Sequence, residues 1–200
     1  MTKTVGEHWV CATLARYDWA PALTRDGLAR TDILAVGTLL PRRPTVEIQV
    51  KTASDRGRNP SWPLGDITRQ SAESEHEWFV LVLLPELPLP PRAFVVPRDH
   101  VCAGTWIRHM DWLTDPSVPE GTRNAGLNLA RIALDVWQGY EGCWDLLGTP
   151  TSEVKVRLPP EFRELAQEKR VGLPPGHPWN EALPLGWRGE QAYSAGHPRT

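Results

Sequence analysis

The sequence predicts a mixed α/β domain of the α+β kind, with a mixed central sheet flanked by helices. Three observations carry this prediction. Apolar and polar side chains alternate along residues 45–52, which is typical of a strand with one buried face. Residues 78–84 form a continuous apolar run, which favours a central strand buried on both faces. Residues 5–17 repeat apolar positions at helical spacing, so a helix precedes the strands.

The other elements of the first half follow from local signals. We expect a short, irregular edge strand within residues 18–24, because Pro21 cannot donate to a strand ladder. Residues 31–39 are predicted as a buried strand, joined to 45–52 by a loop of hairpin length. Residues 53–75 are expected to form an exposed loop, with at most a short helical turn.

The second half is predicted to add one strand and two helices. The strand covers residues 92–96, and a helix covers residues 99–113, between Pro97 and the Asp-Pro pair that follows. Residues 127–147 show a strong helical pattern that ends near Gly148, a residue type common just after helices.

The domain is expected to span residues 1–149. Beyond it, residues 150–200 are predicted to hold one short helix within 158–171 and a tail rich in Pro and Gly. We expect the tail, residues 172–200, to be extended or partly disordered, because Pro and Gly disfavour helices and ladders alike. Trp179 or Trp187 would be its only anchors.

Composition excludes several classes of protein. The formal net charge of −2 over 200 residues argues against a histone-like basic protein. No apolar run approaches the roughly 20 residues that cross a bilayer, and the first residues lack the apolar core of an export signal. The 3 cysteines are far apart and form no CxxC pair, which argues against a zinc knuckle or a disulfide framework. We therefore expect a cytoplasmic protein without membrane partners.

Polar residues of two adjacent predicted strands form the candidate site. Gln49 and Lys51 share one face of their strand, and Asp32 begins the strand that an antiparallel hairpin places opposite them. Carboxylate and amide oxygens suit a divalent cation, and an ammonium group suits a position where negative charge develops. Glu7 lies at the edge of the apolar stripe of the first helix, where a carboxylate needs a partner or a metal.

These residues, read as Gly6-Glu7, Thr31-Asp32-Ile33-Leu34 and Ile48-Gln49-Val50-Lys51-Thr52, resemble the PD-(D/E)XK nuclease superfamily. The Gln variant is similar to its Mrr-like and Holliday-junction-resolvase-like branches. Later segments, among them Trp62-Pro63-Leu64, resemble small, poorly characterised bacterial proteins with this core, so the resemblance spans about residues 5–148. This sequence departs from the family pattern in carrying Gln49 where the family has an acidic ligand, and in lacking a proline before Asp32.

The resemblance implies a restriction-endonuclease-like αβββαβ core and metal-dependent hydrolysis of phosphodiester bonds in nucleic acid, with DNA expected. Repair, restriction or phage defence are the settings it suggests. It makes Glu7, Asp32, Gln49 and Lys51 the catalytic residues. Asp32, Gln49 and Glu7 would hold Mg²⁺, for which Mn²⁺ could substitute. Because many relatives act as dimers, a homodimer is expected.

A basic surface near the predicted site would bind the substrate. Basic residues outnumber acidic ones over residues 41–70, whereas acidic residues dominate residues 71–120. This polarity favours phosphate contacts around the active strand. The candidates for substrate binding are Arg42, Arg43, Arg56, Arg58 and Trp62.

Plainer interpretations stand beside these. The polar face of residues 45–52 could simply be solvated, and Glu7 could be a charge favoured in the first turn of a helix. Glu47 could pair with Arg42 or Arg43, or act as a substitute metal ligand. A second function class is therefore a nuclease-like scaffold without turnover, which binds nucleic acid or a protein partner.

Overall fold

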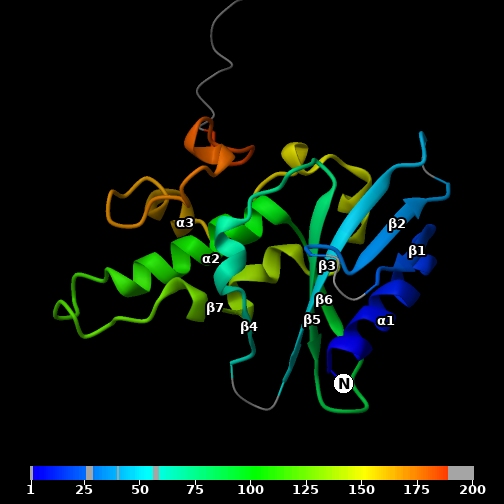
Figure 1. Ribbon diagram of the computed structural model, residues 1–200, viewed down its shortest axis with the longest axis horizontal. Coiled ribbons are helices and arrows are strands. Elements are labelled where there is room, and N and C mark those ends of the chain that lie inside the picture. The colour runs from blue at the N-terminus through cyan, green and yellow to red at the C-terminus, as the bar shows by residue number, and fades with distance from the viewer. Residues whose placement is uncertain (1, 26–28, 40, 56–58, 189–200) are drawn as a thin grey trace, which may run out of the picture.

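The computed structural model describes residues 2–25, 29–39, 41–55 and 59–188 (Figure 1). Five strands form its main sheet in the order β1-β2-β3-β5-β6. Their bounds are β1 Trp19–Leu23, β2 Ile33–Gly37, β3 Thr45–Ser54, β5 Glu77–Leu84 and β6 Arg92–Pro97. Only β3 and β5 are parallel; the other neighbouring pairs are antiparallel. The prediction of a mixed α/β domain with a mixed central sheet is confirmed, and the five predicted strands lie close to their expected positions.

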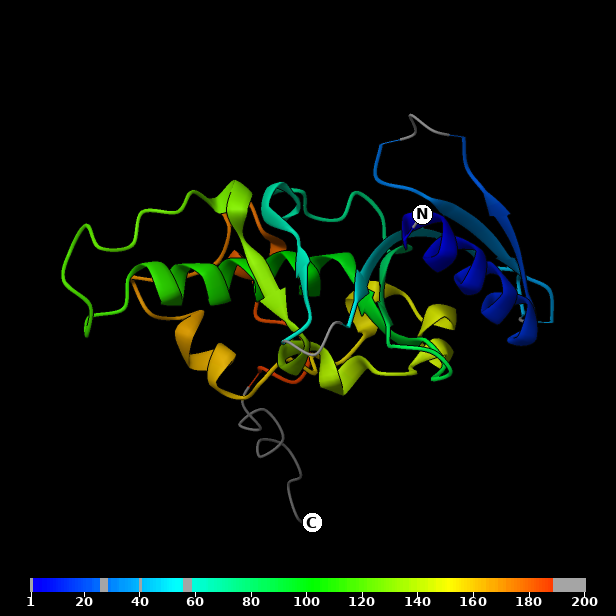
Figure 2. The same ribbon diagram turned by 90° about the horizontal axis from the view of Figure 1, so that it is seen from below.

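One face of the sheet is covered by α1 (Thr2–Arg16), as Figure 2 shows. The apolar residues of β3, among them Val46 and Ile48, are fully buried on this side with Val10 and Leu14 of the helix. Gly6 allows the helix to approach, because a Cβ atom there would lie 2.0 Å from Oγ1 of Thr52. The alternation read from the sequence therefore decides which face of β3 meets α1.

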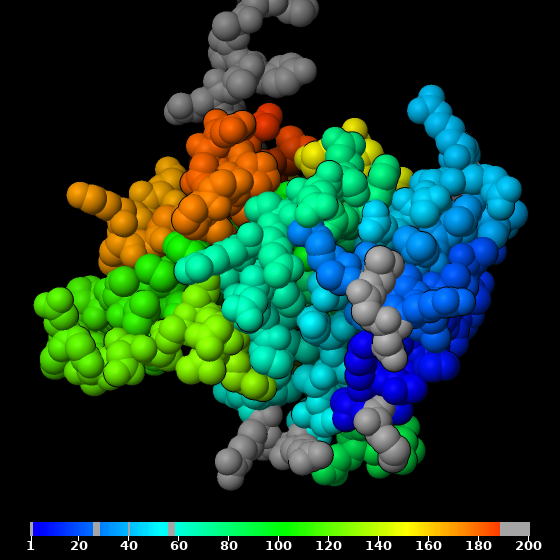
Figure 3. Space-filling model, viewed as in Figure 1, coloured from blue at the N-terminus to red at the C-terminus, as the bar shows by residue number. Residues whose placement is uncertain are grey.

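The opposite face carries α2 (Arg98–Leu113) and the long crossover between β3 and β5. A parallel pair of strands requires such a crossover. Here the crossover contains β4 (Ser61–Pro63) and the 3₁₀ helix η1 (Gly65–Arg69), where an exposed loop with at most a short helical turn was expected. Figure 3 shows these teal residues at the surface in the middle of the molecule.

The single helix expected over residues 127–147 is wrong. The segment instead forms the 3₁₀ helices η2 (Leu127–Leu129), η3 (Leu134–Tyr140) and η4 (Trp144–Gly148), and the strand β7 (Arg131–Ala133), which pairs with β4. Gly139 packs closely against the backbone of Arg157, because a Cβ atom at residue 139 would lie 2.5 Å from the Arg157 carbonyl oxygen. Gly142 has a φ of +66°, a left-handed conformation that glycine adopts readily. Tertiary pairing thus overrides the helical periodicity.

Residues 172–188 pack more closely than the expected extended or partly disordered tail, and both residues named as its anchors, Trp179 and Trp187, are buried. The chain beyond residue 149 forms η5 (Thr151–Glu153), α3 (Glu161–Leu165) and η6 (Pro178–Asn180). Trp179 and Trp187 are buried, with ring centres 5.1 Å apart in edge contact. Their large apolar area holds a segment whose Pro and Gly content suggested an open chain. Residues 189–200 of the predicted tail lie outside the described residues.

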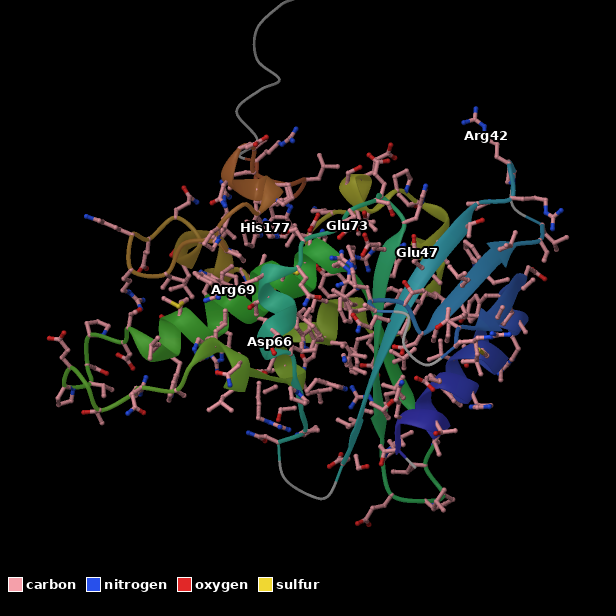
Figure 4. The ribbon with its side chains drawn as sticks, in the orientation of Figure 1. Arg42, Glu47, Asp66, Arg69, Glu73 and His177 are labelled. Carbon is pink, nitrogen blue, oxygen red and sulfur yellow. The ribbon has the colours of Figure 1, made fainter. Side chains whose placement is uncertain are left out.

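Two buried histidines connect this C-terminal segment and η3 to α2. His177, labelled in Figure 4, is 1% exposed, and its Nε2 forms a 3.0 Å hydrogen bond with the backbone oxygen of Asp99. Nδ1 of the same ring accepts from the backbone N–H of Trp179. His100 shares a 2.7 Å hydrogen bond with the Tyr140 hydroxyl. Burial lowers the pKa of His177 and lowers the pKa of His100 to about 3.

These buried histidines predict a loss of stability in acid. Both titrate near 6.5 in an unfolded chain, so below that pH the unfolded state binds more protons than the folded state. The free energy of unfolding should be highest above about pH 6.5. As the pH falls below that value, it should decrease by up to about 1.4 kcal/mol per pH unit for each histidine. For His100 the loss should continue to about pH 3, where the folded protein also takes up the proton.

Urea unfolding between pH 7.5 and pH 4.5 would measure this slope. His177→Gln should make the unfolding free energy depend less steeply on pH, because one group that takes up a proton on unfolding is removed. His8→Gln is the matched control, since His8 is exposed on α1 and has no comparable burial. Equal slopes in the two variants would contradict the prediction.

Candidate functional site

The two predicted carboxylates converge on one ammonium group. Nζ of Lys3 lies 3.3 Å from Oε1 of Glu7 and 3.6 Å from Oδ1 of Asp32. The Glu7 and Asp32 side chains are 14% and 18% exposed, so both sit in a partly desolvated position that solvent still reaches. Lys3 is not among the residues predicted for the site. Its signal was the spacing to Glu7, because residues four apart on a helix face one another.

Asp32 is held in place by the backbone of β3. Its N–H donates to the carbonyl oxygen of Ile48 at 2.9 Å, and its Oδ2 accepts from the N–H of Val50 at 2.8 Å. The antiparallel register that pairs Ile33 with Ile48 places Asp32 at this point, one residue before β2 begins. The predicted antiparallel pairing of the two strands is therefore confirmed. The Asp32 carboxylate has one oxygen fixed by a backbone hydrogen bond and the other facing Lys3.

Gln49 points to the opposite face of the sheet, where α2 begins. Its Oε1 accepts a 3.1 Å hydrogen bond from Nη2 of Arg98. A divalent cation on this oxygen would lie beside a guanidinium charge, and repulsion between like charges opposes that arrangement. The residues present therefore fit a cation at Glu7 and Asp32 better than at Gln49.

Lys51 follows Gln49 on the same face of β3, opposite Leu81 of the parallel strand β5. Its side chain is half-buried, and no hydrogen bond or ion pair joins it to another residue within the described ranges. In the described part of the chain Lys51 therefore forms no ion pair with Asp32, whose carboxylate pairs with Lys3 instead.

A buried ion cluster lies behind Gln49. Oε2 of Glu77 lies 2.7 Å from Nε of Arg98, as an ion pair rather than an aligned hydrogen bond, and accepts a 2.8 Å hydrogen bond from Nη2 of Arg30. Oε1 of Glu77 accepts from the backbone N–H groups of Glu73 and Ser74. The Arg98 side chain is 1% exposed and that of Glu77 is 6% exposed.

Electrostatics and packing hold the cluster together. Burial alone would raise the pKa of Glu77, but the hydrogen bonds from Arg30 and the Glu73 backbone, with the charge of Arg98, bring it below its usual value. Burial lowers the pKa of Arg98, whose guanidinium also lies 4.7 Å from the ring centre of Phe79. Arg98 donates to the backbone oxygen of Arg30 as well. The cluster thus connects α2 to β3, β5 and the residues just before Asp32.

The cluster was not foreseen from the sequence. Arg98 is the first residue of α2, directly after an apolar strand, a position at which a charged side chain usually reaches solvent. Contacts with Glu77, with Gln49 and with the backbone oxygen of Arg30, all far away in sequence, keep it inside.

The predicted substrate residues fall into three groups. Arg42 and Arg43 lie exposed in the turn between β2 and β3, both with left-handed φ values of 64° and 47°. Figure 4 shows Arg42 pointing away from the sheet at the tip of this hairpin. Arg56 and Arg58 lie outside the described residues. The hairpin tip is therefore the described part of the predicted basic surface.

Trp62, predicted to contact substrate, lies in the core instead. It is fully buried rather than open to substrate, with Nε1 donating to the carbonyl oxygen of Val82 and the ring 5.7 Å from that of Phe94. Its burial follows from the pairing of β4 with β7, which covers the sheet. Glu47, labelled in Figure 4, accepts a 3.0 Å hydrogen bond from the hydroxyl of Thr31, not from an arginine of the hairpin.

No model of a known protein family, no curated protein and no solved structure matches this chain. Within the described ranges, no three or more His, Cys, Asp or Glu side chains gather as a metal cluster. The helices that the structure describes are all too short or too polar to cross a bilayer.

Proposed function

We propose that this chain is a metal-dependent nuclease that hydrolyses phosphodiester bonds, with DNA as its expected substrate, in repair, restriction or phage defence. One observation carries the proposal: Glu7 and Asp32, from separate elements, meet around a single positive charge beside the strand that carries Lys51. The element order supports it, because one helix and three antiparallel strands precede a strand parallel to β3. The αβββαβ core has a helix between its third strand and the next one; here β4 and the 3₁₀ helix η1 form that crossover, and α2 follows β6.

Each residue then has a defined role. Glu7 and Asp32 would hold Mg²⁺ or Mn²⁺ in the place that the Lys3 ammonium occupies. Such an ion supplies Lewis-acid polarisation of a phosphate. Lys51 offsets the charge that develops on the phosphate. Gln49, whose Oε1 accepts from Arg98 on the side of α2, would position Arg98 rather than contact the metal. Arg42 and Arg43 would contact the phosphate backbone. We place the activity in the cytoplasm, in a homodimer.

A cleavage assay tests the proposal. Full-length protein is incubated with supercoiled, linear and branched DNA and with RNA, in Mg²⁺ or Mn²⁺ and in parallel with EDTA. We expect cleavage of DNA that EDTA stops. An absence of cleavage of every substrate with both metals would overturn the proposal.

Removal of the Lys51 ammonium should slow cleavage without unfolding the protein. We expect Lys51→Ala to lower the rate by about 10²–10³, the effect of losing one preorganised group that stabilises transition-state charge. Lys51→Arg should not restore the rate, because the planar guanidinium is larger than a compact ammonium. Lys155→Ala is the matched control on the far segment of the chain. Rates equal to the wild type in Lys51→Ala would contradict the role given to Lys51.

Two contacts favour the alternative, a binding module without turnover. Lys3 already neutralises both carboxylates, and Arg98 already occupies the Gln49 oxygen. Lys3→Gln separates the two functions. In a nuclease this substitution should tighten divalent-cation binding, measured by calorimetry, because a competing charge is removed. In a binding module it should produce no metal binding and only a lower melting temperature.

A further inference from the structure

A hollow of about 440 Å³ lies beside the C-terminal half of α2. Arg108 and Trp112 of the helix line one side, and Leu129 and Arg131 of the segment entering β7 line the other. Arg98, which contacts Gln49, precedes Arg108 by about 15 Å along the helix axis. The hollow is therefore separate from the candidate site.

The acidic groups of the hollow are already neutralised. Oδ2 of Asp115 lies 3.2 Å from Nη1 of Arg123, and Oδ1 of Asp111 lies 2.8 Å from Nη2 of Arg170. Both carboxylates on the wall are thus paired with arginines, so the hollow has little uncompensated negative charge to attract a cation.

Two guanidinium groups on the wall carry charge without a carboxylate. Arg131 donates through Nε and Nη2 to the hydroxyl and backbone oxygens of Ser61, which orient it but do not neutralise it. Arg108 is exposed, and no hydrogen bond or ion pair joins its side chain to another residue of the described ranges. The hollow therefore has an excess of positive charge, which favours an anion.

Its remaining wall is aromatic and apolar. Trp112 is 41% exposed and Leu129 is 64% exposed, so two large apolar side chains among those that line the hollow reach solvent. The guanidinium of Arg123, 5.2 Å from the ring centre of Trp112, holds the indole in place. The buried imidazole of His109 lies behind, 5.9 Å from the same ring, and no described residue forms a hydrogen bond with its Nε2.

We propose that this hollow binds a small aromatic anion, with its ring against Trp112 and Leu129 and its phosphate or carboxylate on Arg108 and Arg131. The volume lies within the range of about 300–1,000 Å³ typical of small-molecule sites. A nucleoside monophosphate and an aromatic carboxylate share this chemistry. The proposal does not depend on the proposed nuclease function.

Calorimetry on the full chain in EDTA tests the proposal, because no metal-dependent cleavage can then take place. The probes are AMP and indole-3-acetate, with adenosine and inorganic phosphate as comparators that lack the charge or the ring. We expect AMP or indole-3-acetate to bind at least tenfold more tightly than either comparator, and the stronger of the two identifies the anionic group. Failure of both probes to bind, or equal binding of a comparator, would overturn the proposal.

Variants locate the site. Arg108→Ala should weaken binding of the better probe at least tenfold, and Trp112→Ala should weaken it as well. Arg163→Ala on α3 is the matched control, since it also removes an exposed helical arginine. Alanine is favourable in a helix, so Arg108→Ala should keep the melting temperature. An unchanged affinity in Arg108→Ala, or an equal loss in Arg163→Ala, would show that the ligand lies elsewhere.

Discussion

Asp32→Asn is expected to reduce metal-dependent cleavage by about 10³-fold or more, while the protein stays folded. The amide oxygen can still accept the hydrogen bond from the Val50 N–H, so the start of β2 keeps its anchor. The negative charge is lost, and Glu7 alone then faces the cation. Because hard divalent ions need anionic oxygens, their binding should be lost along with cleavage.

Cleavage rates and calorimetric titration with Mg²⁺ or Mn²⁺ would measure both effects. Asp18→Asn is the matched control, because Asp18 is exposed and its left-handed φ of 61° also suits asparagine. The control should cleave and bind metal as the wild type does. Full cleavage by Asp32→Asn would remove Asp32 from the site.

Glu77→Ala is expected to cost about 3–5 kcal/mol of unfolding free energy. The carboxylate neutralises Arg98 inside the protein and also accepts from Arg30 and from two backbone N–H groups. Without it, a guanidinium that is 1% exposed remains buried and uncompensated. Chemical denaturation followed by tryptophan fluorescence would measure the loss.

Glu86→Ala is the matched control, since Glu86 is exposed in the loop between β5 and β6. It should change the unfolding free energy by less than about 0.5 kcal/mol. A similarly small effect of Glu77→Ala would show that water reaches Arg98 in solution, contrary to its burial in the structure.

Local patterns determined most of the sheet and the first helix. Alternation along β3 and the apolar run of β5 predict these strands because a side-chain period of two leaves no other way to bury the apolar set. The same alternation puts Gln49 and Lys51 on one face. The hairpin register brings Asp32 to the backbone of β3 beside Val50, so spacing alone predicts the strand pairing. It does not predict that Gln49 turns toward α2 while Asp32 meets Glu7 at Lys3.

Long-range contacts decided the rest, because sequence spacing carries no information about them. The pattern of residues 127–147 is equally compatible with a helix and with the short segments that pairing of β7 with β4 imposes. Trp62 and Trp179 are buried by elements that are distant in the chain.

The charges of the candidate site were also decided by the tertiary structure. Glu7 and Asp32 meet at Lys3, whereas Gln49 turns away to Arg98, which Glu77 keeps inside. The sequence by itself determined which residues share a strand face or a helix face. Only the folded chain determined which charge stands beside each of them, because a buried charge takes whichever partner the packing brings within reach.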